Sequence, residues 1–221
     1  MDRKIYIVIV AGGSGTRMGT DIPKQFIELE GVPVLQRTIE KFISALPEAR
    51  IITVLPPNCV QLWKDLCVAH ALDCPQIIVA GGITRFHSVQ NALKKVPDGA
   101  LVFIHDGVRP LVSVELIKRM EEMMQTERAL VPVVPAINTL IYDDGTALDR
   151  QKIKAVQTPQ VFFSEDIKEA YSQAYDTSFT DDSSVVRRLG VPVTLVQGER
   201  FNIKITTPED LILAKAVLSL R

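Results

Sequence analysis

IYIVIV, residues 5–10, leads directly into AGGSGTRMG, residues 11–19. A continuous run of apolar and aromatic residues, four of them isoleucine or valine after the first, is typical of a strand that helices cover on both faces of a parallel sheet. The small residues that follow allow backbone N–H groups to approach a bound phosphate closely. The stretch therefore predicts a parallel α/β sheet with an anion-binding loop at the mouth of its first strand.

The same alternation of short apolar runs and longer amphipathic segments continues along the chain. Strand-length apolar runs lie at residues 5–11, 51–55, 76–80, 101–105, 129–134 and 193–197. Helical periodicity predicts helices over residues 33–46, 60–72, 85–96, 114–125, 165–175, 182–189 and 209–220. We therefore expect a single Rossmann-like α/β domain over residues 1–221, with a mainly parallel twisted sheet and helices on both of its faces.

Residues 136–157 break this rhythm and predict a protruding β-arm. Short strand patterns flank the turn signal DDGT at residues 143–146, with no helix between them. A two-stranded hairpin is marginal by itself, so its apolar residues Leu140, Ile141, Leu148 and Ile153 need a covering surface. A second subunit is the expected cover and predicts a homodimer; the alternative is that the arm folds back on its own domain.

The composition excludes several classes of partner. The 221 residues include 25 Lys and Arg against 26 Asp and Glu, a net charge of −1, so no overall field attracts nucleic acid or an anionic membrane. No apolar run approaches the ~20 residues of a membrane span, and the start of the chain lacks a signal-peptide pattern. Three cysteines without zinc spacing suit a reducing compartment. We expect a cytoplasmic protein that binds anions at a local site.

The glycine-rich loop is specific enough to exclude two ligand classes. Met18 stands where a dinucleotide fingerprint needs its third glycine, and no P-loop Gly-Lys-Ser or Gly-Lys-Thr occurs. Arg17 and Lys24 follow the glycines, and Pro23 keeps their segment from forming a regular helix. Two cations beside such a loop favour a nucleoside triphosphate over the alternative, a glycine turn with solvated charges. The order resembles sugar-nucleotide pyrophosphorylases and related nucleotidyltransferases.

Charged residues also follow other predicted strands. Asp106 emerges at the carboxyl end of the strand at 101–105, where open α/β sheets bind ligands, and suits a Mg²⁺ ion held jointly with substrate phosphates. Arg109 is placed to clamp a second phosphate. His105 is expected to be structural rather than a base. Lys204 is expected at another strand end, just before the last helix, although by itself it would be an ordinary surface lysine. The glycine pair before Thr84 is by itself compatible with a plain strand-to-helix turn.

Six segments taken in order carry a more specific resemblance. They read AGGSGTRMG, PKQF, GGITRFHSV, HDGVRP, QTPQ and NIKITTPEDL, and they span nearly the entire chain. The sequence resembles the 2-C-methyl-D-erythritol 4-phosphate cytidylyltransferase family of the non-mevalonate isoprenoid pathway. The resemblance implies a magnesium-dependent homodimer with exchanged β-arms. It also implies the conversion of CTP and the polyol phosphate into CDP-methylerythritol and pyrophosphate.

The resemblance also assigns roles to residues. For the nucleotide these are Ala11, Gly12, Gly13, Ser14, Gly15, Gly82, Ser88 and Asp106; for catalysis on the triphosphate, Arg17 and Lys24; for the metal, Asp106. For the polyol phosphate they are Asp106, Arg109 and Lys204, with Thr139, Arg150 and Thr158 from the partner's arm. Ile83 departs from family members that carry a polar side chain there, so backbone groups are expected to read the base.

These assignments imply transfer without a general base, because a phosphate monoester with a second pKa of about 6 is already largely dianionic at neutral pH. Fixed cations then have to overcome the repulsion between two anions. Two alternatives stay open. A ribitol-5-phosphate cytidylyltransferase would use the same chemistry on a linear polyol, and a non-catalytic nucleotide-sensing module would keep the loop alone.

Overall fold

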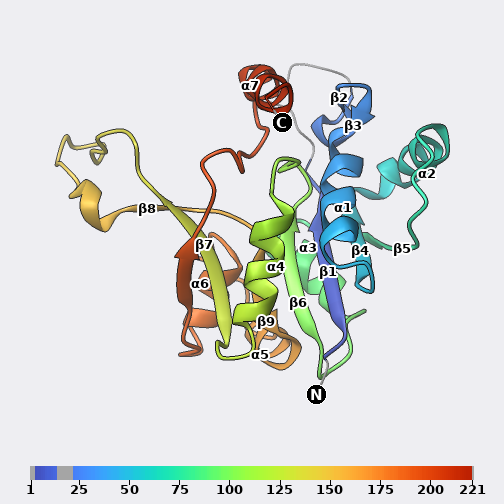
Figure 1. Ribbon diagram of the computed structural model, residues 1–221. Coiled ribbons are helices and arrows are strands. Elements are labelled where there is room, and N and C mark those ends of the chain that lie inside the picture. The colour runs from blue at the N-terminus through green and yellow to red at the C-terminus, as the bar shows by residue number, and fades with distance from the viewer. Residues whose placement is uncertain (1–2, 14–21, 221) are drawn as a thin grey trace.

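The computed structural model describes residues 3–13 and 22–220, which form a sheet of eight strands with helices around it (Figure 1). Seven strands follow the order β10-β7-β9-β6-β1-β4-β5, and β8 pairs with β7. Their bounds are β1 Ile5–Val10, β4 Arg50–Leu55, β5 Gln76–Ala80, β6 Leu101–Asp106, β7 Ala129–Pro135, β8 Lys154–Val156, β9 Gln160–Phe163 and β10 Thr194–Gln197. A small hairpin of β2 (Glu28–Leu29) and β3 (Val32–Pro33) lies outside this sheet.

The helices cover both faces of the sheet (Figure 1). They are α1 Val34–Ala45, α2 Val60–Ala69, α3 Arg85–Leu93, α4 Val114–Met123, α5 Ser164–Ala170, α6 Asp182–Arg187 and α7 Pro208–Leu218, with 3-10 turns η2 Lys24–Phe26, η3 Pro57–Cys59 and η4 Arg150–Lys152. In the part of the chain that the structure describes, no helix has the length and apolar character needed to cross a membrane.

The surroundings of β1 explain why its sequence is apolar throughout. Ile7 and Ile9 lie in one core with apolar residues of α1 and α4, whereas Tyr6 and Val8 lie in a second core with residues of α3 and α5. All four side chains are buried. Because successive side chains of a strand point to opposite faces, a strand between two layers of helices needs apolar residues at every position. The predicted two-sided α/β arrangement is confirmed.

The strand order creates the place where a ligand is expected. β1 pairs in parallel with β4 on one side and with β6 on the other. The chain runs from β1 outward through β4 and β5 and then returns across β1 to β6, which makes the gap between β1 and β6 a topological switch point. Val10 stands opposite Asp106 in the register, so the glycine loop and Asp106 meet at the carboxyl edge of the sheet.

One strand of the sheet was absent from the sequence prediction. β9, reading QVFF, lies between β6 and β7 and is antiparallel to both. Its run of four residues is bounded by Pro159 and Ser164 and follows the arm directly, so it offers too short a pattern to separate from the loop. All seven helices end earlier than predicted, most by one to three residues and α5, which stops at Ala170, by five. α2 stops at Ala69, shortly before Ala71 with φ +50°.

The predicted arm projects from the sheet between β7 and β8 (Figure 1). Its turn forms as expected, with Gly145 at φ +85° and the Thr146 amide donating to Oδ1 of Asp144 at 2.8 Å. The flanking strands are shorter than predicted, because pairing is limited to a bridge between Ile141 and Ala147 and the return passes through η4. Ile141 is 62% exposed, whereas Leu140, Leu148 and Ile153 are half-buried.

Candidate active site

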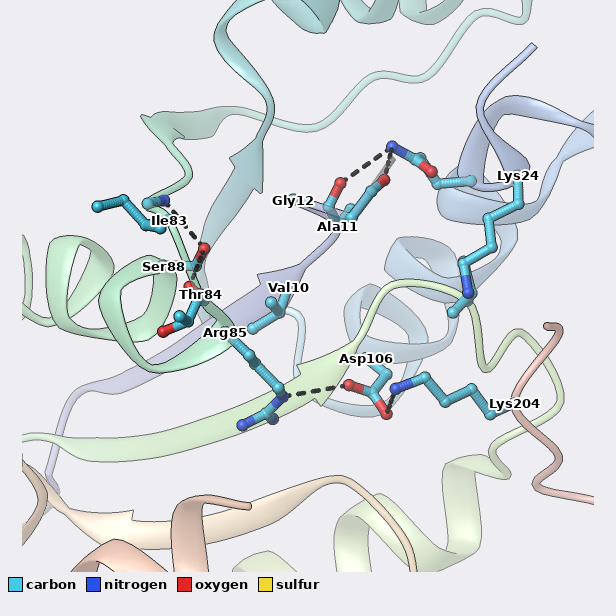
Figure 2. A pocket seen from close by; sticks show the side chains of 14 residues that line it. Val10, Ala11, Gly12, Lys24, Ile83, Thr84, Arg85, Ser88, Asp106 and Lys204 are labelled. Carbon is cyan, nitrogen blue, oxygen red and sulfur yellow. Dashed lines mark hydrogen bonds and ion pairs between the residues drawn. The ribbon is translucent and has the colours of Figure 1, made fainter. Parts of the chain in front are cut away.

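A pocket of about 290 Å³ opens at the switch point (Figure 2). Its walls come from the loops after β1, β5 and β6, from η2 and from the segment that precedes α7. This one pocket brings together eight of the residues singled out in the sequence: Ala11, Gly12, Gly13, Lys24, Gly82, Ser88, Asp106 and Lys204. The side chain of Lys24 extends from η2 toward the Asp106 side of the pocket (Figure 2).

The glycine loop is held by a residue that the sequence analysis did not single out. Gln25 is buried, and its Nε2 donates to the carbonyl oxygens of Ala11 at 3.0 Å and Gly13 at 3.3 Å. The Ala11 amide donates to the carbonyl of Val54 at 2.9 Å. These bonds fix the carbonyls of the loop on the protein side before any ligand binds. The only available signal was that Gln25 directly follows Lys24 in the PKQF segment.

The second glycine segment packs tightly on the start of α3. The Gly82 amide donates to Oγ of Ser88 at 3.0 Å, and that hydroxyl donates to the Thr84 carbonyl at 2.9 Å. A Cβ atom on residue 82 would lie 2.4 Å from Cβ of His87, so the turn needs glycine there. Ser88 therefore braces the wall of the nucleotide pocket as well as lining it.

Asp106 is the electrostatic centre of the site. Its carboxylate is 6% exposed and lies among three cations: Oδ1 is 3.6 Å from Nε of Arg85, and Oδ2 is 3.2 Å from Nε of Arg109 and 3.1 Å from Nζ of Lys204. Burial by itself would raise the pKa of Asp106, but the three positive charges outweigh it and hold the pKa far below its ordinary value. Asp106 is therefore ionised at neutral pH.

A second pocket, of about 550 Å³, lies on the other side of Asp106. Arg85, Asp106 and Lys204 line both pockets, and Arg109 and Thr158 line the second. The carboxylate and its cations thus form the boundary between the two spaces. Such an arrangement suits two anionic ligands that meet at a wall of fixed charge.

His105 is structural, as the sequence predicted. It is fully buried, and its burial lowers the pKa to about 3, so the ring is neutral at physiological pH. Its Nε2 lies 3.3 Å from the Arg109 carbonyl, which can only accept, so Nε2 carries the proton. Nδ1 then accepts from the Thr158 hydroxyl at 3.0 Å. A ring with both nitrogens engaged and a lowered pKa has no free position to act as a base.

Thr158 corrects one sequence-based expectation. It was expected to reach a neighbouring subunit from the arm, but it follows the arm, is buried in its own chain, and accepts from the Asp106 amide at 3.1 Å. Strand β9, which begins two residues after Thr158 and pairs with β6, brings Thr158 beside Asp106. The sequence did not predict this strand. Thr139 and Arg150 do lie on the projecting arm, where Arg150 donates to the Ile137 carbonyl at 3.1 Å. Both side chains are exposed.

Three residues predicted for the nucleotide site have no described position, and Ile83 lies at the rim of the pocket. Arg17, Ser14 and Gly15 lie outside the described residues. Ile83 lines the nucleotide pocket with its side chain 95% exposed, and Figure 2 shows that side chain pointing away from Asp106.

A network that the sequence did not reveal holds the segment carrying Lys204. Asn202 is buried, its Nδ2 donates to the Thr158 carbonyl, and its carbonyl accepts from Arg109, both at 2.8 Å. Gln157 donates to the Glu199 carbonyl at 2.8 Å and tethers the same segment to the end of β8. The QTPQ and NIK motifs marked these places, but only the tertiary contacts show that the two motifs bind each other.

Asp106 is the residue that the sequence analysis singled out for a divalent cation. Residues 3–13 and 22–220 contain no group of three or more His, Cys, Asp or Glu side chains able to hold a metal ion. Oδ1 of Asp106 is 3.6 Å from its cationic neighbour, which is longer than a hydrogen bond and leaves that oxygen able to accept a ligand. One carboxylate joined by substrate phosphates is a usual Mg²⁺ arrangement, so the donor set fits an ion that arrives with a nucleotide.

Comparison with known proteins identifies the family. The model for IspD, 2-C-methyl-D-erythritol 4-phosphate cytidylyltransferase, matches residues 5–220. The chain belongs to this family. Proteins with that name from Bacteroides thetaiotaomicron and Phocaeicola vulgatus are 47% and 48% identical to it. These matches cover 97% and 96% of this chain, and 100% and 99% of the relatives.

Solved structures agree with this cytidylyltransferase assignment. The crystal structure of 4-diphosphocytidyl-2C-methyl-D-erythritol synthase from Anaerococcus prevotii superposes with a TM-score of 0.82 at 31% identity, covering 98% of this chain and 99% of that one. The predicted family, the Rossmann-like α/β fold and the enzyme class, a nucleotidyltransferase, are confirmed. The names of the relatives favour methylerythritol phosphate over the ribitol phosphate alternative.

Proposed function

We propose that this cytidylyltransferase transfers the cytidylyl group of CTP to 2-C-methyl-D-erythritol 4-phosphate, with release of pyrophosphate. The observation that carries the proposal is the pair of pockets that share Asp106, Arg85 and Lys204. One pocket has the glycine loops and Lys24, which suit a nucleotide. The other has Arg109, which together with the shared Lys204 suits the phosphate of the acceptor. The substrates are charged metabolites that do not cross membranes freely, which supports a cytoplasmic location.

The reaction is an in-line displacement at phosphorus. An oxygen of the polyol phosphate forms a bond to the α-phosphorus of CTP, while the bond from that phosphorus to the bridging oxygen of the β-phosphate breaks. The electron pair leaves with pyrophosphate. The nucleophile is already anionic, so no residue has to remove a proton. The neutral, fully hydrogen-bonded His105 is consistent with a reaction that needs no base.

Fixed cations supply the stabilisation. We assign Lys24 and Arg17 to the triphosphate, where charge accumulates as five oxygens surround the α-phosphorus. Arg109 and Lys204 hold the phosphate of the acceptor on the other side of Asp106. We assign the nucleoside to the backbone of Ala11, Gly12, Gly13 and Gly82 with Ser88, which line the first pocket, and to Ser14 and Gly15, which lie outside the described residues. Asp106 holds the acceptor cations in place through its Oδ2 contacts.

Magnesium belongs to this proposal through Asp106. The Asp106 carboxylate would hold the ion jointly with phosphate oxygens of CTP, and the ion would supply positive charge that neutralises the triphosphate and favours departure of pyrophosphate.

The projecting arm supports a homodimer in which the sites are shared. Thr139 and Arg150 lie on the arm and line neither of the two pockets of their own chain. The arm exposes Ile137, Ile141 and Tyr142, a cluster that a second copy of the chain would cover. We assign Thr139 and Arg150 to the acceptor pocket of the partner.

The proposal is tested by measuring pyrophosphate release from CTP and Mg²⁺ with each of two acceptors, 2-C-methyl-D-erythritol 4-phosphate and ribitol 5-phosphate. The expected result is turnover with the first at a much higher kcat/KM than with the second. Turnover with ribitol 5-phosphate alone would reassign the substrate. Binding of CTP without turnover of either acceptor would revive the nucleotide-sensing alternative.

A further inference from the structure

Arg85 stands at the boundary between the two pockets, yet the proposed chemistry leaves it without a role. It is the first residue of α3, and its two terminal nitrogens donate to the carboxylate of Asp182, at 2.8 Å from NH1 to Oδ1 and 2.7 Å from NH2 to Oδ2. Asp182 begins α6 and is fully buried. The remaining nitrogen of the guanidinium, Nε, faces Oδ1 of Asp106 at 3.6 Å (Figure 2).

The Asp182 carboxylate is itself fixed from another direction. The Tyr171 hydroxyl donates to its Oδ1 at 2.6 Å, and Tyr171 is buried against the ring of Phe86, with 4.6 Å between centroids. The guanidinium therefore lies in a rigid frame made by α3, α6 and the end of α5. A bidentate pair of this kind sets the plane of the guanidinium as well as its position.

The carboxylates of Asp182 and Asp106 do not balance the three nearby cations equally. Asp182 balances the charge of Arg85, and only the Nε edge remains for Asp106. The other oxygen of Asp106, Oδ2, contacts Arg109 and Lys204 together. Two cations then share one carboxylate oxygen, which leaves them short of negative charge by about one unit. An arriving phosphate dianion supplies that charge, so the orientation of Asp106 decides where the phosphate binds.

We propose that Arg85 is a positioning residue for the transfer reaction: the positive charge at its Nε attracts Oδ1 of Asp106 and so orients the carboxylate, with Oδ2 toward Arg109 and Lys204 at the boundary between the two pockets. Arg85 acts through Asp106 and not by contact with a substrate phosphate. This inference rests on the proposed function only in that the acceptor carries a phosphate. It assigns Asp182 as the residue that keeps the guanidinium in place.

A double-mutant cycle separates action through Asp106 from direct contact. Arg85→Met is measured alone and in an Asp106→Asn background, with kcat/KM for the polyol phosphate and KM for CTP as readouts. Alone, we expect Arg85→Met to lower kcat/KM for the acceptor by about 10- to 100-fold and to change KM for CTP by less than about threefold. In the Asp106→Asn background the same substitution has less than about a threefold further effect, because the carboxylate it orients has lost its charge.

Two further variants keep the test interpretable. Arg85→Met leaves the buried Asp182 carboxylate without its partner and is expected to destabilise the protein. The pair Arg85→Gln with Asp182→Asn removes both charges, keeps hydrogen-bonding groups, and serves as the variant to analyse if Arg85→Met does not fold. Arg188→Met is the matched control: it breaks an exposed pair with Asp176 near the same helix, lines neither pocket, and should leave all constants near wild type.

The outcomes are distinct. Non-additivity with Asp106→Asn supports the positioning role. An equal loss in both backgrounds, or a loss that falls mainly on KM for CTP, would overturn it and mean that Arg85 contacts a phosphate directly. The cycle uses whichever polyol phosphate the wild-type enzyme accepts. A wrong substrate assignment therefore shows as inactivity of the wild type toward methylerythritol phosphate, whereas a wrong role for Arg85 shows as additivity.

Discussion

The most demanding prediction concerns Gly82, where the structure leaves no room for a methyl group. A Cβ atom on residue 82 would lie 2.4 Å from Cβ and 2.9 Å from the carbonyl carbon of His87. Carbon atoms separate to about 3.5–4.0 Å in ordinary packing, so in Gly82→Ala the start of α3 has to move away by about 1 Å. The hydrogen bond from the Gly82 amide to Ser88, now 3.0 Å, is lost with that movement.

Two effects follow, and they are measured separately. Forcing extra volume into a packed turn costs about 1–3 kcal/mol, which urea denaturation will show as a lower free energy of unfolding. A 1 Å displacement of the pocket wall is expected to lower kcat/KM for CTP by roughly 100-fold, measured by pyrophosphate release. The purified variant is assayed at a temperature where it is fully folded, so the two effects do not merge.

Gly81→Ala is the matched control in the same turn. Its added Cβ would meet Oγ of Ser88 at 3.4 Å and the Leu55 carbonyl at 3.5 Å, which are ordinary contacts. We expect this variant to lose less than about 0.5 kcal/mol of stability. If Gly82→Ala keeps the stability and the kcat/KM of the wild type, the tight packing of the turn against α3 does not control the nucleotide pocket and the reasoning is refuted.

Three other variants test the remaining parts of the site. Gln25→Ala leaves two loop carbonyls without their donor and should lower the free energy of unfolding by about 1–3 kcal/mol and raise KM for CTP; an unchanged KM would show that the loop needs no brace. Because the pKa of Asp106 is lowered in the folded state, the stability it adds over Asp106→Asn should be complete above about pH 5 and shrink as the pH falls below about 4, measured by denaturation at each pH; a gap that grows in acid would contradict the ion-pair cluster. Mixing inactive Lys24→Ala and Arg150→Ala subunits should restore one intact site per heterodimer, and no recovery of activity would count against sites shared through the arm.

The sequence predicted well wherever the signal is local. The apolar run before Ala11 and the acid after residues 101–105 each mark a strand end, and parallel strands bring such ends to one edge. Gly82 follows the end of β5 for the same reason. Lys204 was expected at a further strand end, and this was wrong: it lies in the irregular segment between β10 and α7. The strand order brings the ends of β1, β5 and β6 to the walls of one pocket.

The sequence predicted less well wherever the contact is distant. The pairing of Arg85 with Asp182 joins residues 97 positions apart, and no periodicity connects them. Thr158 was assigned to the partner's arm from the family resemblance, and the sequence did not reveal β9, the short strand that returns the chain to the side of Asp106. Gln25 looked like an ordinary polar residue, because burial among loop carbonyls is decided by tertiary packing. Buried polar residues next to recognised motifs are therefore the positions to examine first.

The central claim is that two phosphate-bearing substrates meet across the Asp106 boundary. The most direct measurement is the rate of pyrophosphate release from CTP with 2-C-methyl-D-erythritol 4-phosphate, compared between the wild type and Lys204→Ala. The account predicts rapid release by the wild type, and a loss on the order of 100-fold in kcat/KM for the acceptor with KM for CTP nearly unchanged. Wild-type kcat/KM for the acceptor in Lys204→Ala, or a loss confined to CTP, would contradict it.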